Sequence, residues 1–144
     1  MTHAREMLDA VPGVIKFGVT EVAAAVDACL DCVQACTSCA DADLVEEDVD
    51  ELRACIALDR NCADVCGVTA RILSRPAHWD GYVVHRLLQA CVRVCTACAE
   101  ECQRHAEHHR HCAICAEVCL ACVRACSALL DTEGFEELQK LAGA

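Results

Sequence analysis

Residues 112–126 read CAICAEVCLACVRAC, and this stretch decides the fold because its five cysteines recur at intervals of 3, 4, 3 and 4 residues. Residues spaced in this way lie on one face of an α-helix. Cysteines at 29–39 repeat the intervals 3, 4 and 3, those at 55–66 have intervals of 7 and 4, and those at 91–102 have intervals of 4, 3 and 4. The sixteen cysteines therefore form four helical stripes, which occupy the a/d seam that faces the interior of a helical bundle.

The rest of the composition is that of a single domain over residues 1–144, with 56% apolar residues and a formal net charge of −11. Four aromatic residues and an acidic surface argue against nucleic-acid binding. The sequence contains no run of 18 uncharged apolar residues, which a membrane-spanning helix would need. Met1–Asp9 carries acidic residues and no long apolar segment, so it is not typical of a secretion signal. We therefore expect a cytosolic protein with reduced thiols, in which cysteines serve metal binding or catalysis rather than disulfides.

Four long helices are predicted, because prolines and glycines are rare within the body of the chain. The acidic stretch Asp41–Asp50 is expected to end the first helix and to supply the N-cap of the second. One helix over 79–130 would be about 78 Å long, so a turn is needed near the histidine run. The predicted fold is an all-α, antiparallel four-helix bundle with a cysteine-lined core. Its helices are expected at about 20–41, 47–73, 79–107 and 110–130, with short flanking helices at about 3–10 and 133–141.

Sixteen small thiols in one core would leave voids that leucine would otherwise fill, so the cysteines are expected to hold metal ions. Soft thiolates select Cu(I), zinc or iron–sulfur clusters. Zinc and iron–sulfur ligands usually come from loops that converge on a point. Cu(I) fits continuous lines of sulfur best, because it accepts two or three thiolates and a thiolate can bridge two ions. We therefore predict several Cu(I) ions per chain, held by all the cysteines: Cys29, Cys32, Cys36, Cys39, Cys55, Cys62, Cys66, Cys91, Cys95, Cys98, Cys102, Cys112, Cys115, Cys119, Cys122 and Cys126.

The histidine run continues the third stripe, since steps of 3 and 4 from Cys102 reach His105 and then His109. These imidazoles are expected to surround the mouth of the bundle and to pass metal inward. His111 lies four residues before Cys115 and is expected to cap the outermost cluster, whereas His108 is expected to point outward. The remaining histidines lie off the stripes and are expected at the surface: His3, His78 and His85.

Two further polar residues accompany the second stripe. Asp59 falls on the inward positions between Cys55 and Cys62, where an unpaired carboxylate would be costly. It is expected to bind a metal or a histidine from well inside the bundle. Asn61 flanks Cys62 and could offer its carbonyl oxygen. For both residues a local hydrogen bond is the alternative interpretation.

The chain resembles the cytosolic copper storage proteins, in the repeated C-x-x-C-x-x-x-C strings and in the histidine cluster before Cys112. The resemblance covers about residues 20–130. It implies a cysteine-rich four-helix bundle that stores Cu(I) along its core, and it implies a homotetramer.

The function predicted is a non-catalytic intracellular store of Cu(I), loaded from glutathione or a copper chaperone, with no nucleic-acid or membrane partner. Two alternatives remain from the residues. One is an iron–sulfur or thiol redox protein, although a thioredoxin-like C-x-x-C would need a preceding strand. The other is a zinc-storing, metallothionein-like bundle or a bundle stapled by disulfides.

Overall fold

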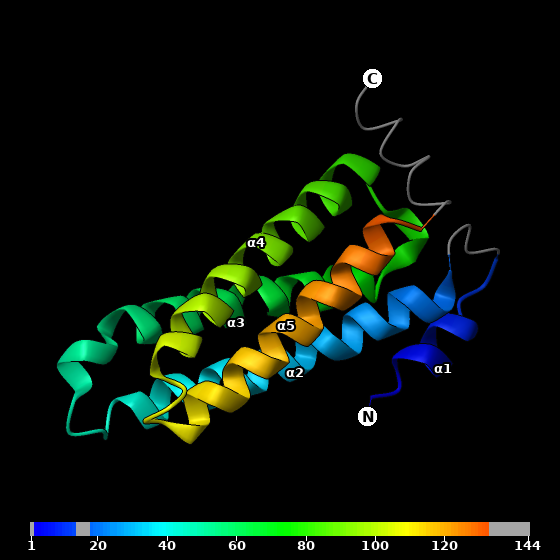
Figure 1. Ribbon diagram of the computed structural model, residues 1–144. Helices are drawn as coiled ribbons and strands as arrows, with labels where there is room; N and C mark the ends of the chain where they lie inside the picture. Colours follow the sequence, from blue (N-terminus) through cyan, green and yellow to red (C-terminus); the bar gives the residue numbers. More distant parts are fainter. Residues whose placement is uncertain (1, 14–17, 133–144) are drawn as a thin grey trace.

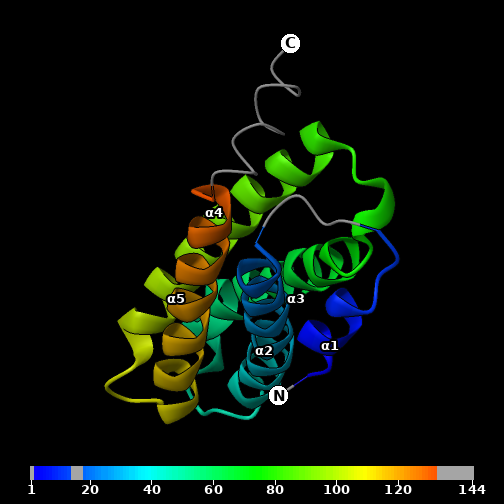
Figure 2. The ribbon, with the colours of Figure 1, turned by 90° about the vertical axis from the view of Figure 1, so that its right-hand side faces the viewer.

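The computed structural model describes residues 2–13 and 18–132, and every regular element in these ranges is helical. Four long helices form the body: α2 (Val19–Asp43), α3 (Arg53–Leu73), α4 (Gly81–His105) and α5 (Arg110–Leu130). Each packs against its two neighbours in the order α2, α3, α4, α5 and back to α2. Figures 1 and 2 show them running alternately up and down, which confirms the antiparallel four-helix bundle.

The connections between the helices differ from the sequence prediction in detail. The acidic stretch does not cap α3: a short 3₁₀ helix, η1 (Val49–Leu52), precedes it, and no side chain caps its first turn. Another 3₁₀ helix, η2 (Pro76–His78), follows α3, and α4 begins at Gly81, two residues after the predicted start at about 79. Asp80 caps α4 by accepting a hydrogen bond from the backbone N–H of Val83.

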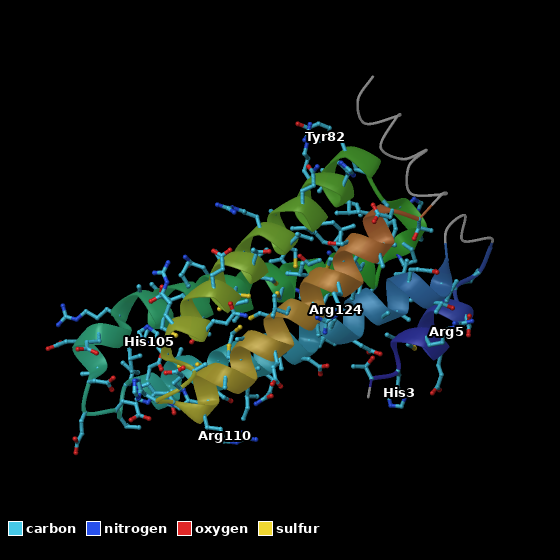
Figure 3. All side chains as sticks on the ribbon, viewed as in Figure 1. His3, Arg5, Tyr82, His105, Arg110 and Arg124 are labelled. Atoms are coloured by element: carbon cyan, nitrogen blue, oxygen red, sulfur yellow. The ribbon has the colours of Figure 1, made fainter. Side chains whose placement is uncertain are left out.

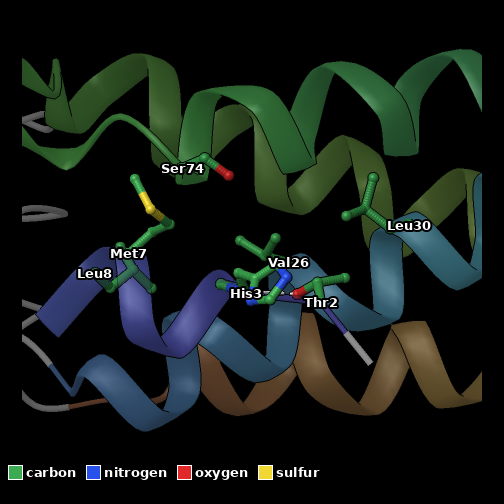
Figure 4. A pocket seen from close by; sticks show the side chains of 8 residues that line it. Thr2, His3, Met7, Leu8, Val26, Leu30 and Ser74 are labelled. Carbon is green, nitrogen blue, oxygen red and sulfur yellow. Dashed lines mark hydrogen bonds between the residues drawn. The ribbon is translucent and has the colours of Figure 1, made fainter. Parts of the chain in front are cut away.

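A short helix precedes the bundle and lies at one of its ends. The short helix α1 (Ala4–Asp9) packs on α2 through the buried Leu8. A groove of about 280 Å³ lies beside it, and Figure 4 shows the side chains that line it. None of these lining residues is a cysteine, so the groove is separate from the thiol core. The flanking helix predicted at 133–141 lies outside the described residues.

The two ends of the bundle have different chemistry. The α2–α3 and α4–α5 connections lie side by side at one end, at the lower left of Figure 1, and we call this end the mouth. The opposite end, which we call the closed end, is filled by apolar side chains that are each at most 1% exposed: Val22, Leu73, Val84, Leu88 and Leu129. The thiols occupy the length between these two ends.

Helices α2 and α5 have the length and mean hydropathy of membrane-spanning helices. Cysteine and alanine account for much of this apolar character, and all nine cysteines of the two helices lie inside the bundle. Their apolar faces are therefore the core-facing faces of a helical bundle.

Candidate metal centre

The four cysteine stripes converge on one interior. All sixteen thiols are free, and none of these residues is more than 2% exposed. Figure 3 shows sulfur atoms between the helices, whereas polar and charged side chains project outward. This arrangement confirms the cysteine-lined core, and it follows from the intervals of 3 and 4, which keep each stripe on one face of its helix.

The sulfur atoms form a continuous ladder along the bundle. Close Sγ–Sγ separations include 3.4 Å for Cys66 and Cys95, and 4.0 Å for Cys36 and Cys98. These separations exceed the bond length of about 2.05 Å in a disulfide. Groups of four Sγ atoms lie within 4.8 Å of one another. From the closed end toward the mouth, four of them are Cys29, Cys66, Cys91 and Cys122; Cys32, Cys66, Cys95 and Cys122; Cys32, Cys36, Cys62 and Cys119; and Cys36, Cys98, Cys115 and Cys119.

Successive groups in this ladder share sulfur atoms. Of these four groups, the first two share Cys66 and Cys122, the middle two share Cys32, and the last two share Cys36 and Cys119. A set of separate tetrahedral sites would need four thiolates of its own at each site. The shared sulfurs are instead arranged as bridging ligands, each within reach of two metal positions.

Asp59 is fully buried inside the ladder, one helical turn from Cys55. Its Oδ1 accepts hydrogen bonds from the thiols of Cys98 and Cys115, at 3.1 and 3.3 Å. Burial, followed by the nearby charge of Cys115, raises the pKa of Asp59 from 3.8 to about 7. The structure thus brings Asp59 together with thiols, and no histidine is among its hydrogen-bond partners in the described part of the chain.

Asp43 is a second buried carboxylate, and it was not among the ligands predicted from the sequence. Its Oδ1 accepts a hydrogen bond from the thiol of Cys112 at 3.6 Å and lies 3.5 Å from Nδ1 of His111. Burial raises its pKa from 3.8 to about 6. The signal was available, because Asp43 stands four residues after Cys39 and so continues the first stripe.

His111 joins the outermost thiols at the mouth. Its Nδ1 lies 3.4 Å from Sγ of Cys39 and 3.6 Å from Sγ of Cys112. With Asp43 these residues form a further group whose candidate ligand atoms all lie within 4.8 Å of one another. The mouth end of the ladder therefore mixes sulfur, nitrogen and oxygen, as the expected capping position of His111 requires.

His105 and His109 face carboxylates. Nε2 of His109 lies 2.9 Å from Oδ2 of Asp48, and its Nδ1 lies 3.4 Å from Oε1 of Glu46, so both ring nitrogens are engaged. The hydrogen bond to Asp48 raises the pKa of His109. Nε2 of His105 lies 3.2 Å from Oε1 of Glu101. Both rings stand at the mouth as expected, but their partners come from α4 and from the α2–α3 connection.

Three other polar residues differ in how far they are exposed to solvent. The side chain of Asn61 is exposed, because one residue along a helix turns the side chain by about 100°, away from the face of Cys62. The structure therefore does not place Asn61 among the thiols. His108 is exposed, as expected. His85, expected at the surface, is instead buried near the start of α4, with 7% exposure.

The thiol core favours the protonated form before any metal binds. All sixteen thiols are buried away from water, and burial disfavours the charged thiolate because the core solvates it poorly. A thiolate needs a compensating cation in such a core. The arrangement can therefore exchange protons for soft monovalent cations along its length.

Comparisons with known proteins give a consistent result. The sequence profile of the family described as "Csp: Copper storage protein" matches residues 19–131. The copper storage protein Ccsp from Streptomyces lividans, loaded with 10 copper equivalents, is 45% identical, with a TM-score of 0.87 over 88% of this chain and 97% of that one. A cytosolic copper storage protein from Streptomyces lividans with five coppers is 50% identical, with a TM-score of 0.76 over 77% and 92%. Cu(I)-bound BsCsp3 of Bacillus subtilis is 32% identical, with a TM-score of 0.68 over 76% and 97%.

Proposed function

The chain belongs to the copper storage protein family, and from this premise we propose that it stores many Cu(I) ions on the thiolates that line its core. The observation that carries the proposal is the ladder of sixteen buried, free thiols whose neighbouring groups share sulfur atoms. Such a ladder suits a cargo that is taken up in quantity, rather than one structural ion at a fixed site.

The sulfur spacing agrees with Cu(I) coordination. Three thiolates around one ion, with metal–sulfur bonds of about 2.3 Å, lie about 4.0 Å from one another. The observed Sγ–Sγ separations include 3.9 Å for Cys39 and Cys112 and 3.8 Å for Cys66 and Cys91. A tetrahedral zinc site would give about 3.8 Å, so spacing alone fits both metals. The shared sulfurs favour Cu(I), because Cu(I) needs only two or three thiolates. Each thiolate can then bind a second ion as a bridging ligand.

The proposed ligands are the sixteen cysteines, together with His111 and the two buried carboxylates, Asp43 and Asp59. His105 and His109 are proposed as residues of the entry region at the mouth. Loading at one ion per thiol preserves charge, because each Cu(I) that binds a thiol releases one proton to solvent. The core therefore fills without a new counter-ion.

The test is a titration of the reduced protein with Cu(I) under anaerobic conditions. We expect uptake on the order of one colourless Cu(I) per cysteine, measured by competition with a chromophoric Cu(I) chelator. Zinc at full tetrahedral occupancy would saturate near four ions (16/4), and iron–sulfur clusters would be brown and contain inorganic sulfide. Saturation at four Cu(I) ions or fewer would contradict storage.

We also propose that the protein is non-catalytic and works in the cytosol, where glutathione or a copper chaperone supplies the metal. The cytosolic description of the 50% identical Streptomyces lividans protein supports this location. The free state of all sixteen thiols suits a reducing compartment.

We propose that the chain assembles as a homotetramer, as the resemblance to cytosolic copper storage proteins implies. Ile114 on α5 and Val68 on α3 are large apolar side chains that are each 44% exposed, and an assembly would cover such positions. Light scattering coupled to size-exclusion chromatography is expected to give about four times the chain mass of 15.5 kDa. A mass of one chain at micromolar concentration would contradict the tetramer.

A further inference from the structure

We propose that Glu46 is a positioning residue, whose carboxylate orients the His111 ring so that Nδ1 presents its lone pair to Cys39 and Cys112. The role of Glu46 in copper binding rests on the proposed function. The contact between Glu46 and His111 is present without any metal. Oε1 of Glu46 lies 3.0 Å from Nε2 of His111, on the side of the ring opposite to the two thiols.

The proton on the ring follows from this geometry. An ionised carboxylate only accepts hydrogen bonds, so a nitrogen 3.0 Å away from it carries a proton. A neutral imidazole has one N–H, which leaves Nδ1 as an acceptor or metal ligand. The other tautomer would donate from Nδ1 to Asp43 over 3.5 Å and would leave the Nε2 lone pair facing Glu46. The shorter contact and this repulsion both select the Nε2–H form.

The position of Glu46 is set by the fold. It lies in the α2–α3 connection, where its backbone N–H donates to the carbonyl of Asp43 at the end of α2. His111 lies in the first turn of α5, so the contact joins the two connections that form the mouth. The His109 ring stacks on the His111 ring, with centroids 5.5 Å apart, and Asp48 of the same connection holds His109. The His111 ring is therefore restrained at its edge by Glu46 and on one face by His109.

A carboxylate behind a metal-bound histidine is a known means of fixing the tautomer and raising ligand basicity. Here the carboxylate stands behind a ring that faces two thiols at the outermost group of the ladder. The Glu46 carboxylate contacts two rings, those of His111 and His109, at 3.0 and 3.4 Å. Only His111 is a proposed ligand, so the effect of Glu46 on copper affinity is expected in the group of Cys39, Asp43, His111 and Cys112.

The first measurement uses the reduced, metal-free full chain with ¹⁵N-labelled histidine at about pH 8. Long-range proton–nitrogen spectra report which ring nitrogen of His111 carries the proton. The wild-type protein is expected to show the Nε2–H tautomer. Glu46→Ala is expected to give a mixture of the two tautomers. Glu46→Gln retains an acceptor oxygen, so its fraction of the Nε2–H tautomer is expected to lie between those of the wild type and Glu46→Ala. Glu47→Ala, an exposed neighbour, is the matched control and should leave the spectrum unchanged.

The second measurement follows the same His111 signals while a Cu(I) chelator, bathocuproine disulfonate, removes copper from the loaded protein. The chelator concentration that half-empties the His111 position is expected to fall about tenfold in Glu46→Ala. In a protein that already carries His111→Ala, the measured quantity is the total copper retained. Adding Glu46→Ala to that protein should not change it further. An Nδ1–H tautomer in the wild type, or an unchanged tautomer in Glu46→Ala, would overturn the inference. Failure of copper uptake with the expected tautomers would instead overturn the proposed function alone.

Discussion

Copper loading is expected to raise the melting temperature of the protein by more than about 20 °C. The reason is that a ligand bound only by the folded state stabilises it, by about 4 kcal/mol per site when the free ligand is at 1,000 times its dissociation constant. Three independent sites would already add about 12 kcal/mol, and a domain of this size gains about 2–4 °C for each kcal/mol. The sixteen thiols offer more positions than that.

Calorimetry or circular dichroism of the reduced protein, with and without Cu(I) at one ion per cysteine, measures this rise. Removal of copper by bathocuproine disulfonate is the control, and it should restore the melting temperature of the metal-free protein. A rise of less than about 5 °C in the loaded protein would show that copper does not bind in the folded core.

Replacing Asp59 with asparagine is expected to stabilise the metal-free protein at pH 8 by about 2–4 kcal/mol. Burial raises the pKa of Asp59 from 3.8 to about 7, and each pKa unit corresponds to about 1.4 kcal/mol. Because the folded-state pKa of this acid is raised, ionisation opposes folding. The cost is absent below about pH 4, grows between about pH 4 and 7, and is complete above about pH 7.

Urea denaturation of the reduced, metal-free protein at pH 4, 5.5 and 8 measures this effect as the difference between the wild type and Asp59→Asn. The difference should increase with pH and level off above about pH 7. Asp64→Asn, an exposed substitution on the same helix, is the matched control and should change the free energy of unfolding by less than about 0.5 kcal/mol at each pH. If the difference for Asp59→Asn does not change with pH, the pKa of Asp59 is not raised in the folded protein.

The fold and the thiol core could be predicted from the sequence because both depend on local periodicity. The intervals of 3 and 4 between cysteines determine which face of each helix turns inward, and short connections determine that neighbours are antiparallel. Asp59 was identified by the same rule. Asp43 obeys the rule as well, but it stands inside an acidic stretch that we interpreted as a helix end and cap.

The mouth could not be predicted to the same extent, because its contacts join residues that are far apart in the sequence. The pairing of Glu46 with His111, 65 residues away, depends on where two connections meet in space. No periodic pattern encodes that meeting, and the same holds for His109 and Asp48. Asn61 was proposed as a ligand because it is next to Cys62 in the sequence. Adjacent residues of a helix point in different directions, so Asn61 faces away from the thiols.

The apolar closed end has a consequence for the order in which ions leave. Because the buried side chains of Leu73, Leu88 and Leu129 fill the closed end, we expect copper ions to enter and leave at the mouth, past its histidines and carboxylates. The ions bound deepest are then expected to leave last. Copper near the mouth is expected to exchange first, and copper at the closed end is expected to form a reserve that is released only after the outer positions are empty.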